Sequence, residues 1–259
     1  MINNISLNLE KRISVSGTLW EKRIKKTDTD DSQILKNSNL DYILETILYG
    51  RKIQKDEFDS FLDPKVNKLL NDPNNLIDMD VAVKRIVTSM IEKKKIGIIG
   101  DYDVDGTTSA SLLTNFFSYY SIDTDVYIPN RLKDGYGPNI EAFNQFIDKG
   151  IDTVITVDCG STAIQPLEYA FNKDINVIII DHHKVDHNLP QCFAHINPTR
   201  DDDKSELNHL AAVGLTFLFI IALRRKLREI KQFNHISEPN LKKYLDIVAL
   251  GTICDVVQL

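Results

Sequence analysis

The chain has 259 residues, of which 42% are hydrophobic and 26% are charged. This composition is typical of an ordinary globular protein and excludes a disordered or fibrous chain. The 31 Lys and Arg residues are outnumbered by 37 Asp and Glu residues, which gives a net charge of −6. Any nucleic-acid contact must therefore come from a local basic patch, and not from an overall positive surface. Dense basic clusters occur at residues 22–26 and 224–228.

Neither the cysteines nor the apolar segments indicate export or membrane insertion. The three cysteines are isolated and form no CxxC pair, so neither a disulfide framework nor a structural zinc site is expected. The amino-terminal residues lack the apolar core of a signal peptide. The longest apolar run, Leu210 to Leu223, is shorter than the ~20 residues that span a bilayer, and we interpret it as a buried core helix. We therefore expect a cytoplasmic protein without membrane contact.

The composition changes along the chain and divides it into two parts. Residues 1–75 are rich in Asn, Asp and Lys and carry only short apolar clusters, which predicts a mostly helical amino-terminal arm. Residues 76–259 begin with a segment whose apolar residues recur at helical spacing, and we expect them to form a second domain.

From residue 96 onward, short apolar strands alternate with helical segments. The predicted strands cover residues 96–100, 125–129, 152–157, 175–180 and 192–198. The predicted helices between them cover residues 107–120, 141–150 and 161–173. Such alternation is typical of an α/β fold with a parallel, doubly wound sheet and flanking helices on both faces.

Acidic and histidine side chains follow three of these predicted strands directly. They are Asp101, Asp103 and Asp105 after the first strand, Asp158 after the third, and Asp181, His182 and His183 after the fourth. In open α/β sheets, sites form at the carboxyl ends of the strands, so these groups are expected to meet in one place. Carboxylates with imidazole suit Mn²⁺ or Mg²⁺, and the number of groups is enough for a pair of ions.

The segment that starts at Asp101 has two other interpretations, and each fails on spacing. An EF-hand loop starting there would have Gly106 at its sixth position but needs a Glu at its twelfth, where Leu112 stands. A P-loop needs a Gly-Lys-Ser/Thr sequence, which does not follow Gly100. Gly106 is instead expected to open a helix with its backbone amides directed at an anion.

Four stretches of the sequence carry a resemblance to a known family. They are GDYDVDGTTSASLL, VDCGSTA, DHH and ALGTICDVV, and they occur in the order and approximate spacing of the DHH phosphoesterase superfamily. Within it, the chain resembles the RecJ family of single-strand-specific 5′→3′ DNA exonucleases, to which YIPNRLKDGYGPN and HINPTRDDD are also similar. The resemblance covers nearly the whole chain and implies a nuclease of DNA repair and recombination.

Carried over residue by residue, the resemblance implies two bound ions, Mn²⁺ or Mg²⁺. The implied ligands are Asp101 and Asp103 for the first ion, Asp105, His182 and Asp255 for the second, and Asp158 as a bridge between them. Asp255 enters this set through the resemblance alone, because it follows an apolar helix over residues 245–250 and a Gly-Thr break and could be an ordinary helix-end carboxylate.

The resemblance also implies residues that touch the substrate. His183 would lie beside the scissile phosphate and stabilise charge or assist proton transfer. Contacts to phosphate or nucleotide are implied for Arg131, Tyr136 and Arg200, since an arginine fork suits phosphate and an aromatic face suits an unstacked base. For these three residues the alternative of a surface arginine or a packed tyrosine stays open.

The chain departs from the family at its carboxyl end. It stops four residues after Asp255, whereas RecJ-family proteins continue into a second substrate lobe and an OB-type module. Three explanations stay open: a natural truncation, a split protein with a separately encoded carboxy-terminal lobe, and a fragment.

The function that we expect is metal-dependent hydrolysis of single-stranded DNA from the 5′ end, with weak DNA binding by this chain alone. One alternative is a phosphodiesterase that acts on short oligonucleotides or cyclic dinucleotides. The other is a half-size protein that binds metal but catalyses nothing alone.

Overall fold

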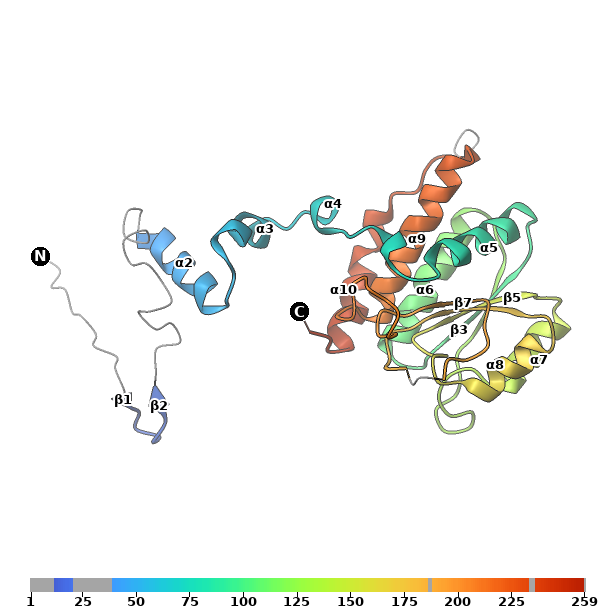
Figure 1. Cartoon of the computed structure of the whole chain (residues 1–259), viewed down its shortest axis with the longest axis horizontal. Helices are drawn as coiled ribbons and strands as arrows, with labels where there is room; N and C mark the ends of the chain where they lie inside the picture. Colours follow the sequence, from blue (N-terminus) through green and yellow to red (C-terminus); the bar gives the residue numbers. More distant parts are fainter. Residues whose placement is uncertain (1–11, 21–38, 186–187, 233–235, 259) are drawn as a thin grey trace, which may run out of the picture. The chain divides into compact units, whose positions relative to one another are not determined.

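The computed structural model describes residues 12–20, 39–185, 188–232 and 236–258 (Figure 1). The chain forms two compact units, Met1–Leu70 and Asn71–Leu259. The basic cluster at residues 22–26 lies outside the described residues. All residues that the sequence analysis assigns to the site belong to the second unit.

The described part of the first unit is mostly helical, as predicted for the amino-terminal arm. Its helices are α2 (Asn39–Gly50), the 3-10 helix η1 (Lys55–Glu57), α3 (Phe58–Leu62) and α4 (Val66–Leu69). A short antiparallel hairpin of β1 (Arg12–Ile13) and β2 (Leu19–Trp20) precedes them and was not predicted.

The second unit is built on a five-stranded sheet in which all neighbouring strands run parallel. The strands are β3 (Ile96–Gly100), β4 (Thr124–Tyr127), β5 (Thr153–Val157), β6 (Asn176–Ile180) and β7 (Ala194–Ile196). Their order is β4-β3-β5-β6-β7, so the chain builds outward from β3 in both directions. At such a reversal a crevice opens between the carboxyl ends of the two strands concerned, here β3 and β5.

Successive strand residues pack into two separate cores, because side chains alternate between the two faces of a sheet. Ile98 and Ile178 belong to one core, whereas their neighbours Ile99 and Ile179 belong to the other. The first core is covered by α5 (Met79–Ile91), α6 (Val104–Tyr119), α9 (Ala212–Glu229) and α10 (Leu245–Cys254). The second is covered by α7 (Ile140–Asp148) and α8 (Ile164–Phe171), on the other side of the sheet in Figure 1. The predicted parallel, doubly wound α/β fold is therefore confirmed.

The apolar run at residues 210–223 forms most of α9, in agreement with its interpretation as a core helix. Leu215, Phe219 and Leu223 are fully buried there. No helix among the described residues is both long and apolar enough to cross a bilayer. The described part of the unit also contains the short 3-10 helices η2 (Pro73–Asn75) and η4 (Leu241–Tyr244). All three cysteines are free.

Helix α6 begins at Val104, three residues earlier than predicted. The Asp103 side chain caps the helix by accepting a hydrogen bond from the Gly106 amide at 3.0 Å. That amide is thus used inside the helix, and the prediction that it points at an anion is wrong. Gly106 is required for close packing, since a Cβ there would lie 2.5 Å from the backbone N and O of Asp101.

Helix α10 runs through Gly251 and Thr252, where a break was predicted. A Cβ at Gly251 would lie 2.4 Å from Thr108 Oγ1 and 2.8 Å from Val213 Cγ1. The glycine therefore permits a close crossing of α10 over α6 and α9 and does not end the helix. As a result, Asp255 lies at the carboxyl end of α10, beside the start of α9.

Candidate metal centre

Three aspartates follow β3 and occupy three different positions. Asp101 extends the strand, because its backbone amide donates to a carbonyl of β5 at 3.2 Å, and it is 3% exposed. Asp103 is the N-cap of α6. Asp105 lies in the first turn of α6, and its two carboxylate oxygens accept hydrogen bonds from the amides of Ala212 (2.6 Å) and Val213 (2.8 Å). Asp105 therefore ties α6 to the start of α9 at the edge of the crevice.

Asp158 directly follows β5, and its side chain accepts no hydrogen bond from the described residues. Its backbone amide donates to the Ile180 carbonyl at 3.0 Å, which fixes its position at the end of the sheet. The residue is 1% exposed, and both carboxylate oxygens are buried without a donor. Burying an unpaired carboxylate costs several kcal/mol, so the side chain fits a place next to a cation.

The imidazole of His182 lies among three carboxylates. Its Nε2 atom is 3.3 Å from Asp158 Oδ1, 3.6 Å from Asp255 Oδ2 and 3.8 Å from Asp105 Oδ2. No described residue forms a hydrogen bond with this buried nitrogen. The four side chains come from β5, β6, α6 and α10 and converge on one place.

The candidate ligands form adjoining groups. In each of three groups, three side chains bring one ligating atom apiece within 4.8 Å of one another. The groups are Asp101 with Asp103 and Asp158, Asp105 with His182 and Asp255, and Asp158 with His182 and His183. Asp158 and His182 each belong to two groups, so the three groups adjoin one another at these two side chains.

Four carboxyl groups of this centre have a raised pKa. Burial, followed by the charges of Asp105 and Asp103, raises the pKa of Asp158 to about 10. Burial also raises the pKa of Asp101, Asp105 and Asp255. Neighbouring carboxylates without countercharges repel one another, and divalent cations remove this repulsion. The donor set therefore suits hard cations such as Mn²⁺ or Mg²⁺.

Asp181 is as buried as Asp158 but has four hydrogen-bond donors. Its carboxylate accepts from the amides of Ser161 (3.1 Å), His182 (2.8 Å) and His183 (3.2 Å), and from His183 Nδ1 (2.7 Å). Burial alone would raise the pKa of Asp181. The hydrogen bonds from His183 and Ser161 outweigh this effect and lower the pKa to about 2. The hydrogen bond to Asp181 in turn raises the pKa of His183. Asp181 is thus a charged acceptor that holds His183.

Tyr136 and Arg131 lie beside the centre. The Tyr136 hydroxyl donates to the Asp158 carbonyl at 3.0 Å and lies 3.3 Å from His183 Nδ1. The exposed Arg131 guanidinium lies 5.3 Å from the centre of the Tyr102 ring, and no described residue forms an ion pair with it. Both side chains are therefore placed where a substrate can reach them.

Arg200 is used differently. Its side chain is 8% exposed and donates to both carboxylate oxygens of Asp202, at 2.9 and 2.7 Å. It also donates to Asp78 Oδ2 at 2.9 Å and to the His195 carbonyl at 2.6 Å. The phosphate contact expected from the sequence has no support in this geometry, because the guanidinium already holds the segment after β7 against the start of α5.

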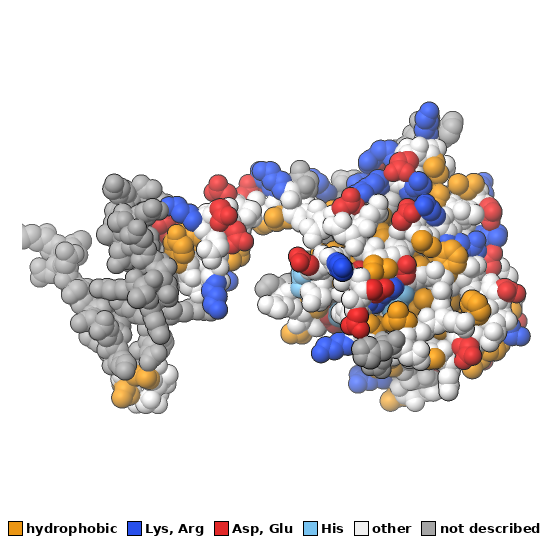
Figure 2. Space-filling model, viewed as in Figure 1, with side chains coloured by type: hydrophobic (Ala, Val, Ile, Leu, Met, Phe, Trp, Pro, Cys, Tyr) orange, Lys and Arg blue, Asp and Glu red, His pale blue; other side chains and the backbone are white. Residues whose placement is uncertain are grey.

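The basic cluster on α9 is paired with acidic residues. The pairs are Arg224 and Arg228 with Glu238, Arg225 with Asp72, and Lys226 with Glu229. On the face drawn in Figure 2, Lys and Arg side chains of the second unit are interspersed with Asp and Glu side chains. This pairing weakens the attraction of the cluster for phosphates.

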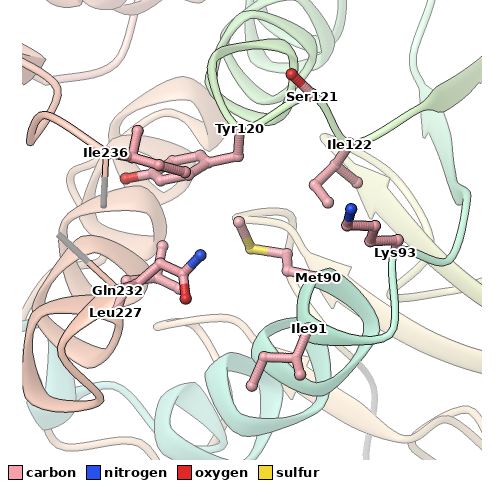
Figure 3. A pocket seen from close by; sticks show the side chains of 9 residues that line it. All are labelled: Met90, Ile91, Lys93, Tyr120, Ser121, Ile122, Leu227, Gln232 and Ile236. Atoms are coloured by element: carbon pink, nitrogen blue, oxygen red, sulfur yellow. The ribbon is translucent and has the colours of Figure 1, made fainter. Parts of the chain in front are cut away.

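A separate hollow of about 450 Å³ lies between the carboxyl-terminal ends of α5, α6 and α9 (Figure 3). Its lining is largely apolar and includes Met90, Ile122 and Leu227. The 16 residues of α6 separate it from the carboxylates by ~24 Å, at 1.5 Å per residue. This hollow is therefore not part of the candidate metal centre.

Residues 95–252 match the model of the DHH family, N-terminal domain. The chain belongs to the DHH family. It is 34% identical over 240 residues to the single-stranded-DNA-specific exonuclease RecJ of Haemophilus influenzae. These residues are 92% of this chain and 40% of the relative. It is also 37% identical over 187 residues to RecJ of Escherichia coli, and these residues are 71% of this chain and 32% of the relative. The chain thus spans less than half the length of these relatives.

Solved structures show the same similarity. A structure of exonuclease RecJ bound to manganese matches with a TM-score of 0.60 and 29% identity, over 70% of this chain and 44% of the other. RecJ from Thermus thermophilus in complex with Mn²⁺ matches with a TM-score of 0.62 and 26% identity, over 82% of this chain and 28% of the other.

Three buried polar residues behind the DHH segment were not identified from the sequence. They are Ser161, His195 and Asn197, which form a hydrogen-bonded chain that ends on the carbonyl of His183. Ser161 and Asn197 follow β5 and β7 closely, as the candidate ligands follow β3, β5 and β6. Small polar residues just beyond strand ends were therefore the available signal.

Proposed function

We propose that this chain is the metal-binding part of a two-metal phosphodiesterase that hydrolyses single-stranded DNA from its 5′ end, in DNA repair and recombination. The observation that carries the proposal is the buried carboxylate of Asp158, which accepts no hydrogen bond from the described residues and lies between two groups of ligating atoms. The similarity to RecJ exonucleases supports the substrate, and the manganese in the compared structures supports the metal.

The proposed ligand roles follow the groups of side chains. Asp101 and Asp103 would hold one ion, Asp105, His182 and Asp255 would hold the other, and Asp158 would be shared, because it has a ligating oxygen within 4.8 Å of those of Asp101, Asp103 and His182. Two such ions, when bound, polarise a phosphoryl oxygen and activate water. The hydrogen bonds from the amides of Ala212 and Val213 keep the Asp105 carboxylate in place before any ion arrives.

The other side chains act on the substrate in this proposal. His183, held by Asp181, presents its imidazole to the phosphate and stabilises charge or transfers a proton. The exposed guanidinium of Arg131 contacts a phosphate, and the ring of Tyr136 contacts a nucleotide. Arg200 is left out of the substrate contacts in this proposal, because four of its five N–H donors already bond to Asp202, Asp78 and the His195 carbonyl.

We further propose that residues 76–259 are the DHH domain and residues 1–75 an accessory arm. The relatives are more than twice as long as this chain. Full activity therefore requires a further carboxy-terminal lobe, in the same polypeptide or encoded separately, that closes the substrate cleft.

The test is hydrolysis of single-stranded oligonucleotides in the presence of Mn²⁺. We expect a 5′-labelled strand to release labelled mononucleotide at once and a 3′-labelled strand to shorten stepwise. The Asp158→Ala protein should do neither. Release of label from the 3′ end first, or equal activity of the variant, would refute the proposal.

A second candidate is a phosphodiesterase for short oligonucleotides or cyclic dinucleotides. The pairing of the α9 basic cluster with acidic residues favours it, because a short substrate needs no extended basic groove. Rapid cleavage of a dinucleotide together with an intact long strand in the same assay would select this candidate.

A further inference from the structure

His183 is held by Asp181 at its ring and backbone amide and by Asn197 at its backbone carbonyl. The ring Nδ1 and the backbone amide both bond to Asp181 Oδ1, at 2.7 and 3.2 Å. The backbone carbonyl accepts from Asn197 Nδ2 at 2.9 Å and lies 2.8 Å from Thr199 Oγ1. The ring itself is nevertheless 47% exposed at the crevice.

The hydrogen bonds of Asn197 leave its side chain a single orientation. Its Nδ2 group donates one proton to the His183 carbonyl and the other to Ser161 Oγ at 2.9 Å. Its Oδ1 atom accepts from the Thr199 amide at 2.8 Å, and the single Thr199 hydroxyl proton is shared between this Oδ1 and the His183 carbonyl, each 2.8 Å from Thr199 Oγ1. A flipped amide would place an acceptor against the His183 carbonyl, so every donor and acceptor of Asn197 is satisfied in one orientation only.

Ser161 extends this chain in two directions. Its hydroxyl lies 2.9 Å from Nε2 of His195, and its backbone amide donates to Asp181 Oδ2 at 3.1 Å. Ser161 and His195 are each 2% exposed, and Asn197 is fully buried. Removing one member would leave a buried polar group without a hydrogen-bond partner, which is unfavourable. The network therefore links the ends of β5, β6 and β7 rigidly behind the DHH segment.

We propose that Asn197 and Ser161 are positioning residues for His183. Asn197 fixes the backbone of His183, and Ser161 fixes both Asn197 and the Asp181 carboxylate that orients the ring. This inference rests on the proposed role of His183 at the phosphate. Asn197 contacts His183 directly and Ser161 contacts it through Asn197 and Asp181, so both are expected to act on catalysis through His183.

The variants Asn197→Ala and Ser161→Ala test this inference, with Thr153→Val as a matched control. Thr153 is equally buried and its hydroxyl accepts from Arg85 at 2.6 Å, but it lies at the opposite end of β5, away from His183. All three variants disturb a buried polar network. Only the first two should affect His183.

The first readout is the order of the His183 backbone amide, measured by ¹⁵N relaxation with diamagnetic Mg²⁺ present. In the unaltered protein and in Thr153→Val we expect an order parameter of about 0.85, and in Asn197→Ala a value below about 0.6. Ser161→Ala should give an intermediate value, and it carries the test if Asn197→Ala does not fold. This readout does not depend on hydrolysis, so it separates failure of the inference from failure of the proposed function.

The second readout is hydrolysis of bis(p-nitrophenyl) phosphate with Mn²⁺. Because a misplacement of about 1 Å can cost about 10²-fold in rate, we expect kcat to fall between about 10- and 100-fold while KM is unchanged. Mn²⁺ binding measured by calorimetry should also be unchanged. In a His183→Ala background, Asn197→Ala should cause no further loss, since the two residues act as one unit.

Three results would overturn the inference. One is an unchanged His183 order parameter in both variants. Another is a lower order parameter with an unchanged kcat. The last is an equal loss of kcat from Asn197→Ala with and without the His183 side chain, which would show that Asn197 acts elsewhere.

Discussion

Replacing Asp158 by Asn should stabilise the metal-free protein at neutral pH. The pKa of Asp158 is about 10 in the fold, against 3.8 for an ordinary Asp. The pKa of Asp158 is higher in the folded than in the unfolded protein, so folding is favoured most below pH 3.8, where the carboxyl is neutral in both states. The free energy of unfolding then falls as the pH rises from 3.8 toward 10. Between pH 3.8 and pH 7, an interval of about 3 pH units, the free energy of unfolding falls by about 4 kcal/mol, at 1.36 kcal/mol per unit.

This value is an upper bound, because a neighbouring carboxyl that takes up a proton relieves the same repulsion. An Asn side chain has no proton to lose and avoids the penalty. The Asp158→Asn variant should therefore be more stable than the unaltered protein by up to about 4 kcal/mol. In a unit of this size each kcal/mol raises Tm by about 2–4 °C, so the expected rise in Tm is up to roughly 8–16 °C. The rise should shrink toward zero as the pH is lowered to 4.

Thermal unfolding followed by circular dichroism, between pH 4 and 8 and with EDTA, measures this effect. The control is Asp148→Asn, which alters an exposed carboxyl at the end of α7 and should leave Tm unchanged. Saturating Mn²⁺ should reverse the order, because the ions stabilise the unaltered protein, by about 2.7 kcal/mol per site at 100 times Kd, and the variant much less. A metal-free Asp158→Asn protein that is no more stable than the unaltered one at pH 7 would refute the electrostatic reasoning.

Three further outcomes are expected. Gly106→Ala should destabilise the fold by about 1–3 kcal/mol or more in denaturant unfolding, since its Cβ would overlap the backbone of Asp101 and force α6 away from β3. Unchanged stability would contradict this packing. Arg200→Ala should cost roughly 1–3 kcal/mol in the same measurement, because it removes the hydrogen bonds of a buried guanidinium to Asp78, Asp202 and the His195 carbonyl, yet Mn²⁺ binding should not change. A selective loss of substrate affinity would return Arg200 to the substrate site. Single-stranded DNA should bind this chain weakly and with a strong salt dependence in fluorescence anisotropy, since the α9 basic cluster is paired with acidic residues, and a submicromolar Kd at physiological salt would contradict this.

The periodicity of the sequence was sufficient to predict the sheet and its helices. Buried parallel strands such as β3 and β6 are short continuous apolar runs, and the segments between them have helical spacing. The ends of the helices were harder to predict from the sequence. The start of α6 depends on the cap by Asp103, and the continuity of α10 depends on a close crossing at Gly251 that only the folded chain reveals.

The candidate site was predictable to the extent that strand ends meet at one edge of a sheet. Asp101, Asp158 and His182 each follow a strand, and the structure brings them together. Asp158 and Asp181 illustrate the limit, because both directly follow a strand of the same sheet and both are buried. One has no donor and a raised pKa, whereas the other has four donors and a lowered pKa. Such a difference arises from tertiary hydrogen bonds and leaves no trace in the local sequence.

Hydrogen-bond partners that are distant in the sequence could not be predicted either. The amides that hold Asp105 come from Ala212 and Val213, more than a hundred residues away, and the role of α9 in the site follows from them. Arg200 shows the converse case. Its place in a motif suggested a phosphate contact, but Asp78 and Asp202 use its donors.

The central claim is that two ions bind side by side and share Asp158. Titration of the metal-free chain with Mn²⁺, followed by calorimetry and by electron paramagnetic resonance, tests it directly. The account predicts two Mn²⁺ ions per chain with a spin-coupled spectrum, as expected for ions about 3.5–4 Å apart, and loss of that coupling in Asp158→Ala. A single bound ion, or two ions whose spectra stay uncoupled and unaffected by Asp158→Ala, would contradict the account.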